Sequence, residues 1–144
     1  MQLDIFENTK YKFFSLGSGS SGNCYYLGCS DYGILIDAGV GIRTIKKTLT
    51  EYGVSFSKIM GVLVTHDHAD HVKAIGYFGD KFSIPIYATE AVHDGIRRNR
   101  YIQADLITSK RIIEKELPFT IRDFEITAFN VPHDSLENVG YHIK

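Results

Sequence analysis

Residues 65–71, Thr-His-Asp-His-Ala-Asp-His, constrain the fold of this chain more than any other segment. The whole chain has six histidines, and three of them lie within six positions here, interleaved with two aspartates. The apolar run 61–64 before them has the β-branched character of a buried strand, and apolar residues at 72, 75 and 78 predict one face of a helix after them. The segment is therefore expected in the turn from a strand into a helix, where open α/β folds place ligand sites.

The spacing of these side chains predicts metal binding. In a locally extended turn, residues two apart point the same way, so His66 and His68 can reach one metal ion. Asp70 and His71 fall at the start of the helix and could hold a second ion close by. Imidazole and carboxylate ligands suit Zn²⁺, and also iron or manganese. Two alternatives stay open: the helix macrodipole also favours Asp70 at this position, and a histidine cluster can lie on a surface without function.

Three pieces of the sequence resemble one known family. Residues 65–71 resemble the H-x-H-x-D-H signature of the metallo-β-lactamase-fold hydrolases. Residues 34–39, Ile-Leu-Ile-Asp-Ala-Gly, resemble the strand ending in Asp-x-Gly that precedes this signature. Residues 13–23 resemble the opening of one branch, the bacterial YycJ/WalJ-type proteins, which are described as single-strand DNA exonucleases. The resemblance extends from about Tyr11 to the end of the chain.

The resemblance implies an α+β fold, the αββα metallo-β-lactamase sandwich, of which this chain would form the N-terminal half as a mixed sheet flanked by helices. It implies a metal-dependent phosphodiesterase or single-strand DNA exonuclease that uses a metal-bound hydroxide. The expected cofactors are two divalent metal ions, zinc first, with manganese or iron as alternatives. The same signature also serves thioester, lactone and other small-ester hydrolases, and a non-catalytic metal-binding fragment is a third hypothesis.

The resemblance also assigns the metal ligands. His133 lies where a predicted strand ends, as the third metal-binding histidine does in the family, so His66, His68 and His133 are expected to share one ion. Asp70 and His71 are expected to begin the second site, with Asp70 also catalytic.

Asp37 and the Gly/Ser-rich loop 17–23 are expected beside these ligands. Asp37 would lie behind the histidine loop and hold it by hydrogen bonds without touching the metal; capping of a turn is the alternative. Ser18, Ser20 and Asn23 are the candidate contacts for a substrate phosphate. The alternative for their loop is a tight hairpin connection, and it is not a P-loop, since no Gly-Lys-Ser/Thr follows.

The family pattern continues beyond the residues present here, with an aspartate that bridges both metals and a final histidine. No residue after Lys144 can be matched to them. We therefore expect residues 1–144 to be one metallo-β-lactamase-like domain that is truncated at its C-terminus and impaired as an enzyme. An uncovered face of the half sandwich predicts self-association.

Composition narrows the partners and the compartment. The net charge of −1 gives no global attraction to nucleic acid or an anionic membrane. The chain has no apolar run long enough for a bilayer, and its N-terminus lacks the pattern of a signal peptide, so a cytoplasmic location is expected. Cys24 and Cys29 are spaced as neither a redox nor a metal motif and are expected to be small buried or half-buried residues.

The remaining pattern predicts the secondary structure around the site. Strands are expected at 12–16, 24–28, 34–36 and 83–88, with Pro85 at an edge or a strand start. Amphipathic helices are expected at 41–52 and at 90–98, the second capped by Thr89 with Ala91, Val92 and Ile96 inward. Residues 119–128 alternate around a turn at 122–123, and a last strand is expected at 139–143.

Overall fold

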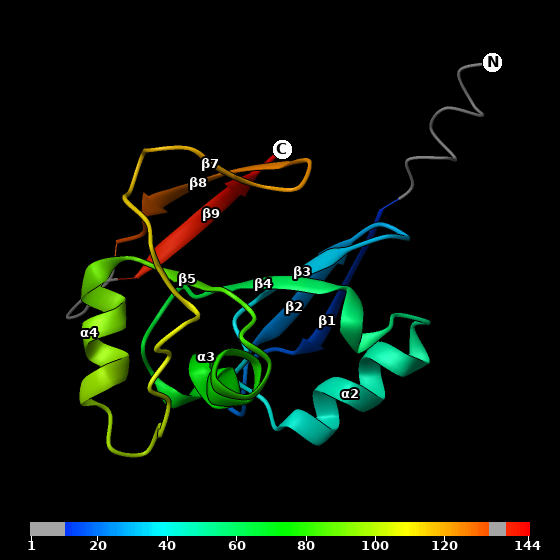
Figure 1. Cartoon of the computed structure of the whole chain (residues 1–144), viewed down its shortest axis with the longest axis horizontal. Helices are drawn as coiled ribbons and strands as arrows, with labels where there is room; N and C mark the ends of the chain where they lie inside the picture. The colour runs from blue at the N-terminus through cyan, green and yellow to red at the C-terminus, as the bar shows by residue number, and fades with distance from the viewer. Residues whose placement is uncertain (1–10, 133–137) are drawn as a thin grey trace.

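The fold is seen in a computed structural model that describes residues 11–132 and 138–144. Strands and helices alternate through the first part of the chain, and strands alone follow (Figure 1). The strands are β1 (Lys12–Gly17), β2 (Cys24–Gly28), β3 (Gly33–Ile36), β4 (Ile59–Leu63), β5 (Ile86–Ala88), β6 (Lys110–Ile112), β7 (Phe119–Ile121), β8 (Phe124–Asn130) and β9 (Val139–Ile143). The helices are α2 (Ile42–Glu51), α3 (Ala69–Val72), α4 (Glu90–Arg98), the short 3₁₀-helix η1 (Phe56–Lys58) and the π-helix η2 (Tyr77–Lys81).

The larger sheet is mixed, as the sequence predicts. Its six strands lie in chain order from β1 to β6. The pairs β1–β2 and β2–β3 are antiparallel, whereas β3–β4, β4–β5 and β5–β6 are parallel. Because β3 and β4 are parallel neighbours, their carboxyl ends lie at the same edge of the sheet. This places Asp37, directly after β3, beside the histidine segment that follows β4.

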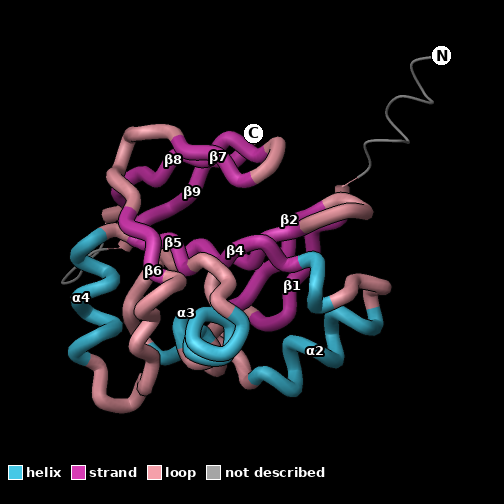
Figure 2. The backbone as a smooth tube through the Cα atoms, viewed as in Figure 1, coloured by secondary structure: helices cyan, strands magenta, loops and turns pink. Residues whose placement is uncertain are grey.

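Helices cover one face of this sheet, and the antiparallel sheet β7–β8–β9 covers the other (Figures 1 and 2). One hydrophobic cluster, which includes Ile45, Val62 and Ile75, packs the helices on the large sheet. A second cluster, which includes Ile34, Leu63 and Ile126, fills the space between the two sheets. The prediction of an α+β fold with a mixed sheet is confirmed. The helices, however, lie on one side of the sheet because the other side packs on the second sheet.

Most of the predicted elements form with small shifts of their ends. The side chain of Thr89 accepts a hydrogen bond from Val92 N at 3.3 Å and caps α4 as expected. Val92 and Ile96 are buried, but the prediction that Ala91 points inward is wrong, because it lies exposed on the first turn of α4. Pro85 precedes β5 and so marks a strand start; β5 itself is interior, between β4 and β6.

The helix after the histidine segment begins at Ala69, and its predicted apolar face is real. Val72, Ile75 and Phe78 are all fully buried against the sheet. Beyond α3 the chain widens into the π-helix η2, a form that is rare and often found at functional sites. The periodic pattern at 72, 75 and 78 gives no sign of this widening.

Both cysteines are free thiols, as expected. Cys24 is fully buried in β2, and burial, together with the charge of Asp37, raises the pKa of its thiol. Cys29 is half-buried. Within the described residues, every helix is too short or too polar to cross a bilayer.

Candidate metal centre

The histidine segment leaves β4 and is fixed at once to Asp37. The backbone N–H of Thr65 donates to Asp37 Oδ1 at 2.8 Å, and its hydroxyl donates to Asp37 Oδ2 at 2.7 Å. The backbone N–H of Asp37 donates in turn to Leu63 O at 2.7 Å. Asp37 is only 3% exposed and has a φ of 63°, a left-handed conformation that aspartate tolerates better than most residues. Its carboxylate is thus a buried anchor for the loop.

The same carboxylate orients His71. Oδ2 of Asp37 lies 2.7 Å from Nδ1 of His71, so the ring donates through Nδ1. Nε2 of His71 then points the other way and lies 3.8 Å from Oδ2 of Asp70. Burial lowers the pKa of His71, but the hydrogen bond and charge of Asp37 and the charge of Asp70 outweigh it and raise that pKa on balance. A histidine held through Nδ1 by a carboxylate and free to bind through Nε2 is the usual arrangement of a metal ligand.

His66 and His68 lie together at the start of the segment. Their ring centroids are 3.9 Å apart with the planes nearly perpendicular, and the rings of His66 and His71 are 5.2 Å apart. His66 is buried and His68 is exposed, so one ring forms the floor of the site and the other its rim. Backbone N–H of His68 donates to Nδ1 of His66 at 3.3 Å. The structure therefore brings His66, His68 and His71 to one place.

Asp67 is a candidate that the sequence reasoning left without a role. Ligand atoms of His66, Asp67 and His68 all lie within 4.8 Å of one another. Oδ1 of Asp67 is buried and makes no hydrogen bond within the described part of the chain. The carboxylate packs on α4 at Gly95, where an added Cβ would overlap Asp67 Oδ2. In the sequence, only the position of Asp67 between two candidate histidine ligands indicates a role in the site. Its contact with α4 joins residues that are far apart in the sequence, so no local pattern predicts it.

The loop 17–23 lies against the start of α3, where the sequence analysis placed it. Asn23 N donates to Asp70 O at 2.7 Å, and Gly39 N donates to Asn23 O at 2.8 Å. The side-chain amide of Asn23 donates to Gly19 O and Asp70 O, while its oxygen accepts from Gly19 N. Asn23 thus joins this loop to the backbone of Asp70, and an additional contact of its side chain with substrate stays a prediction.

Of the predicted substrate contacts on the loop, Ser20 lies nearest to a candidate ligand. Ser20 and Asp70 line the same cavity of about 370 Å³. Ser18 is exposed on the loop and stays a predicted substrate contact. His133 lies outside the described residues, so its assignment as the third ligand of the first ion also stays a prediction.

These residues fit a site for divalent metal ions. Imidazole nitrogens and carboxylate oxygens converge at one edge of the sheet. Among the described residues, the buried Oδ1 of Asp67 has no hydrogen-bond partner and could bind a metal ion. His66 and His68 could hold one ion, with the carboxylate of Asp67 beside them. Asp70 and His71 could hold a second, with Nε2 of His71 already turned toward Asp70.

Comparison with known proteins identifies the family. Residues 32–144 match a family model described as the beta-lactamase superfamily domain. The chain belongs to this superfamily. Its β-lactamase superfamily fold is shared with the class B3 di-zinc metallo-β-lactamase LRA-12 from an Alaskan soil metagenome, with a TM-score of 0.76 at 14% identity over 91% of this chain and 53% of that one. At this identity the likeness concerns the fold alone.

Two relatives show which superfamily members this chain is similar to. Exodeoxyribonuclease WalJ of Streptococcus pneumoniae serotype 2 is 32% identical over 88% of this chain and 47% of its own length. Exodeoxyribonuclease YycJ of Bacillus anthracis is 30% identical over 90% of this chain and 48% of its own length. The chain spans about half the length of these curated relatives. The predicted resemblance to the YycJ/WalJ-type branch is thereby confirmed.

Proposed function

We propose that this chain binds divalent metal ions at residues 65–71 and serves in the hydrolysis of phosphodiester bonds in single-stranded DNA. The observation that carries the proposal is its similarity to WalJ and YycJ, both named exodeoxyribonucleases, over 88% and 90% of the chain. The side-chain geometry supports it, because imidazole and carboxylate groups converge beside a cavity that opens toward a serine-containing loop.

Each side chain of the centre has a proposed task. His66 and His68, with His133, hold the first ion, and Asp70 with His71 holds the second. Divalent ions bound there would supply a hydroxide near neutral pH and neutralise charge on the phosphate. Asp70 is our candidate for the group that accepts a proton from the attacking water, because its carboxylate lines the cavity and lies 3.8 Å from His71 Nε2.

Two other groups position these ligands or the substrate. Asp37 fixes Nδ1 of His71 and the backbone of Thr65, so the ligand rings are oriented before an ion arrives. Ser20 and Ser18, on the loop bound to the start of α3, are proposed to donate to non-bridging phosphate oxygens. Hydroxyls suit this task, because they hydrogen-bond the phosphate without adding negative charge.

The test is turnover by the metal-loaded chain. A 5′-labelled single-stranded oligonucleotide, the corresponding duplex and a panel of thioesters and lactones are offered to the wild type and to Asp70→Asn. We expect cleavage of the single strand, lowered by about 100-fold or more in Asp70→Asn if a catalytic proton transfer is lost. Asp31→Asn is the matched control, since Asp31 is exposed on the turn before β3.

The outcomes separate the substrate classes. Turnover of thioesters or lactones without cleavage of DNA would reject the phosphodiester assignment while leaving a hydrolase. Cleavage that Asp70→Asn and Asp31→Asn support equally would reject the role of Asp70. Thermal melting of all three proteins shows whether any loss reflects unfolding.

A further inference from the structure

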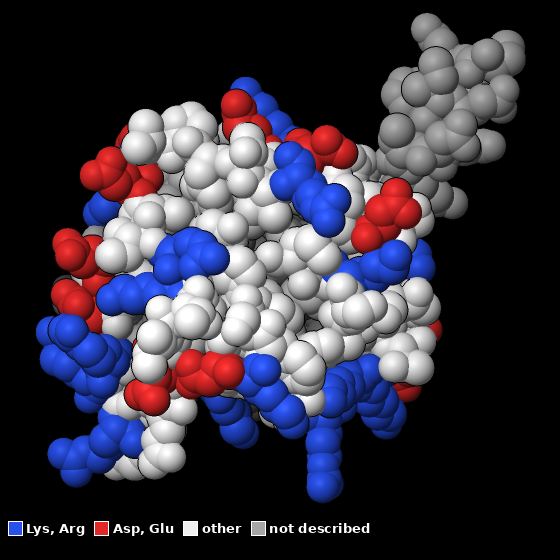
Figure 3. Space-filling model, viewed as in Figure 1, with Lys and Arg blue, Asp and Glu red and all other residues white. Residues whose placement is uncertain are grey.

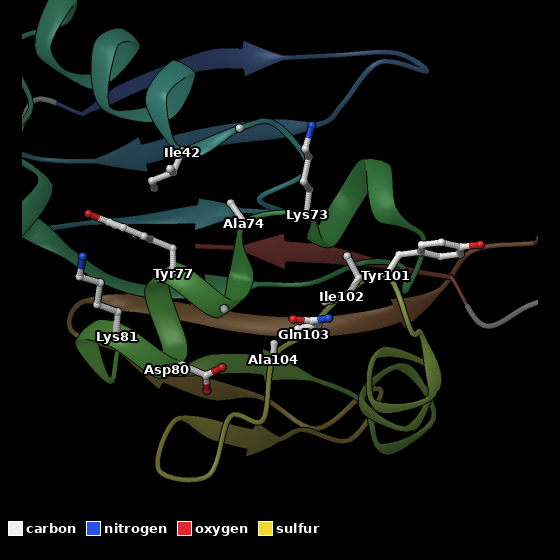
Figure 4. A pocket seen from close by; sticks show the side chains of 12 residues that line it. Ile42, Lys73, Ala74, Tyr77, Asp80, Lys81, Tyr101, Ile102, Gln103 and Ala104 are labelled. Carbon is white, nitrogen blue, oxygen red and sulfur yellow. The ribbon is translucent and has the colours of Figure 1, made fainter.

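A second cavity lies next to the metal centre. It has a volume of about 600 Å³ and is lined by the start of α2, the residues that follow α3, η2 and the loop that follows α4. Figure 4 shows Tyr77 and Lys81 on one side of it and Lys73 and Tyr101 on the other, with Gln103 between them. None of these five residues belongs to the proposed ligand set. The cavity is therefore a candidate for binding a part of the substrate that lies away from the scissile bond.

This cavity adjoins the one that contains Asp70. The smaller cavity that contains Ser20 and Asp70 is also lined by Lys73, Tyr101 and Ile102. The same three residues line the larger cavity. Together, the two adjoining cavities form a depression that extends from Asp70, past Lys73 and Tyr101, to η2. A ligand that extends from the metal centre has this depression as an open path.

Basic side chains lie along this path, although the whole chain has a net charge of −1. Lys73 and Lys81 line it directly. Nζ of Lys81 lies 5.0 Å from the centroid of the Tyr77 ring, and Nζ of Lys46 lies 4.7 Å from the same centroid and donates to the Tyr77 hydroxyl. Basic side chains lie along the lower edge of the molecule near α2 and α3, with acidic side chains beside them (Figure 3). Amines at these positions can neutralise successive phosphates.

The one acidic residue that lines the larger cavity is already engaged. Oδ2 of Asp80 accepts from Asp105 N at 3.0 Å, and Oδ1 accepts from Leu106 N at 2.7 Å. The carboxylate therefore faces the loop backbone, and its charge is partly balanced there. It fixes the loop that forms the opposite wall, so we do not expect it to repel a bound phosphate strongly.

An exposed aromatic ring lies where the two cavities meet. Tyr101 is 84% exposed, although its backbone is fixed by a hydrogen bond of 3.0 Å from its N–H to Asn99 Oδ1. A large ring on a fixed backbone, beside a lysine, offers a flat face on which a base can stack. Tyr77 lies farther along the path, on the π-helix, where its half-buried ring contacts Phe82 and lies near the amines of Lys46 and Lys81.

We propose that a DNA single strand passes from the metal centre along this depression, with a base stacked on Tyr101 and phosphates bound by Lys73 and Lys81. The inference rests on the proposed function and extends it to the path of the substrate. A single strand is required because a base in a duplex has both faces covered by its neighbours and cannot lie on a tyrosine ring.

The test measures binding separately from cleavage. The metal-loaded 144-residue chain is titrated into a fluorescein-labelled phosphorothioate (dT)₂₀, which resists hydrolysis, and anisotropy gives the Kd at several salt concentrations. We expect Tyr101→Ala to weaken binding by about tenfold, the loss of one stacked base. Lys73→Ala and Lys81→Ala should each reduce the slope of log K against log salt by about 0.7.

Matched variants control for general effects of substitution. Ile107→Ala removes an equally exposed apolar side chain, 86% exposed, from the same loop as Tyr101. Lys144→Ala removes an exposed lysine from the second sheet, where it pairs with Glu125. Both variants should bind the oligonucleotide as the wild type does.

The results distinguish this path from the proposed function. Hydrolysis of bis(p-nitrophenyl) phosphate, which is too small to reach η2, reports the metal centre alone. Wild-type hydrolysis of this ester with no oligonucleotide binding, or with binding unchanged in Tyr101→Ala, Lys73→Ala and Lys81→Ala, would overturn the path and leave the function. Binding that depends on these residues, without hydrolysis of bis(p-nitrophenyl) phosphate or of the unmodified oligonucleotide, would support the path and reject the function.

Discussion

Replacement of Asp37 by Asn tests how the metal centre is organised. The amide is nearly isosteric with the carboxylate and keeps one acceptor, so Oδ1 can still bind Thr65 N, now 2.8 Å away. At the other position an NH₂ group would face the Thr65 hydroxyl and Nδ1 of His71, at present both 2.7 Å from Oδ2. Nδ1 of His71 would then have to accept a hydrogen bond, which places the ring proton on Nε2, the atom that faces Asp70.

The expected result is a fold that survives and one metal site that weakens. Loss of a carboxylate behind a ligating histidine lowers metal affinity by about 10- to 100-fold, or about 1.4–2.7 kcal/mol. The site of Asp70 and His71 should change most, because the Asp37 carboxylate binds Nδ1 of His71 directly, whereas Nδ1 of His66 accepts from the backbone N–H of His68. Competition against a chromophoric zinc chelator measures each affinity, and thermal melting reports the fold.

Thr65→Val separates the two tasks of Asp37. It removes the hydroxyl contact with Oδ2 but keeps the backbone bond to Oδ1 and the pairing of Asp37 with His71. Zinc affinity at the second site should fall much less than in Asp37→Asn. Equal losses in both variants would show that loop position, and not the protonation state of His71, sets the affinity. Wild-type zinc binding by Asp37→Asn would refute the argument altogether.

Three further predictions concern the fold around the site. Buried His93 donates through Nε2 to a backbone carbonyl of β6, and burial lowers its pKa from 6.5. Its contribution to stability should therefore be complete above about pH 6.5 and lost as the pH falls through the pKa of the folded state. Between pH 7 and pH 5, the free energy of unfolding in urea should fall more for the wild type than for His93→Gln. A chromogenic disulfide reagent should modify Cys29 in the native protein and Cys24 only after unfolding, since burial raises the pKa of Cys24; rapid modification of both would contradict this. Gly39→Ala should lower the free energy of unfolding by about 1–3 kcal/mol or more, because the added Cβ would overlap the backbone of α3, whereas Gly41→Ala, which has open space around it, should not.

Local patterns were sufficient to predict most of the elements and the segment that carries the site, but not the π-helix η2 or β6. The strand predicted at 61–64 forms as β4, which begins two residues earlier and ends one residue earlier than predicted. The turn predicted at 122–123 joins β7 and β8. In each case the deciding interactions are local: alternation fixes the buried face of a strand, and a residue such as Arg122, with a φ of 53°, forms the turn. The burial of Ala91 was predicted wrongly because a small apolar residue near a helix start carries little information about its face.

Contacts between segments that are far apart in the sequence could not be predicted from local patterns. Asp67 packs on α4 through a gap that only Gly95 leaves open, and neither residue's local neighbourhood suggests the pairing. Asn23 was read as a substrate contact because of its residue type, but the structure also shows its amide bound to the backbone of Asp70, which is 47 positions away. The depression lined by Lys73 and Tyr101 likewise exists only because the loop after α4 returns to α3.

The two proposed metal sites are held by different parts of the fold. Asp70 and His71 are bound through their backbones to Asn23 and Ala38, and the ring of His71 is bound to Asp37, so the β2–β3 region positions them. The first site depends instead on the loop after β4 and on the fit of Asp67 against α4. Both supports meet at the carboxyl edge of the parallel pair β3–β4, because that pairing alone brings the ends of the two strands together. A small change in the packing of α4 can therefore alter the first site while the second keeps its geometry. The joint action of two metal ions on a phosphate depends on their separation, and this separation is set by how the two supports are joined.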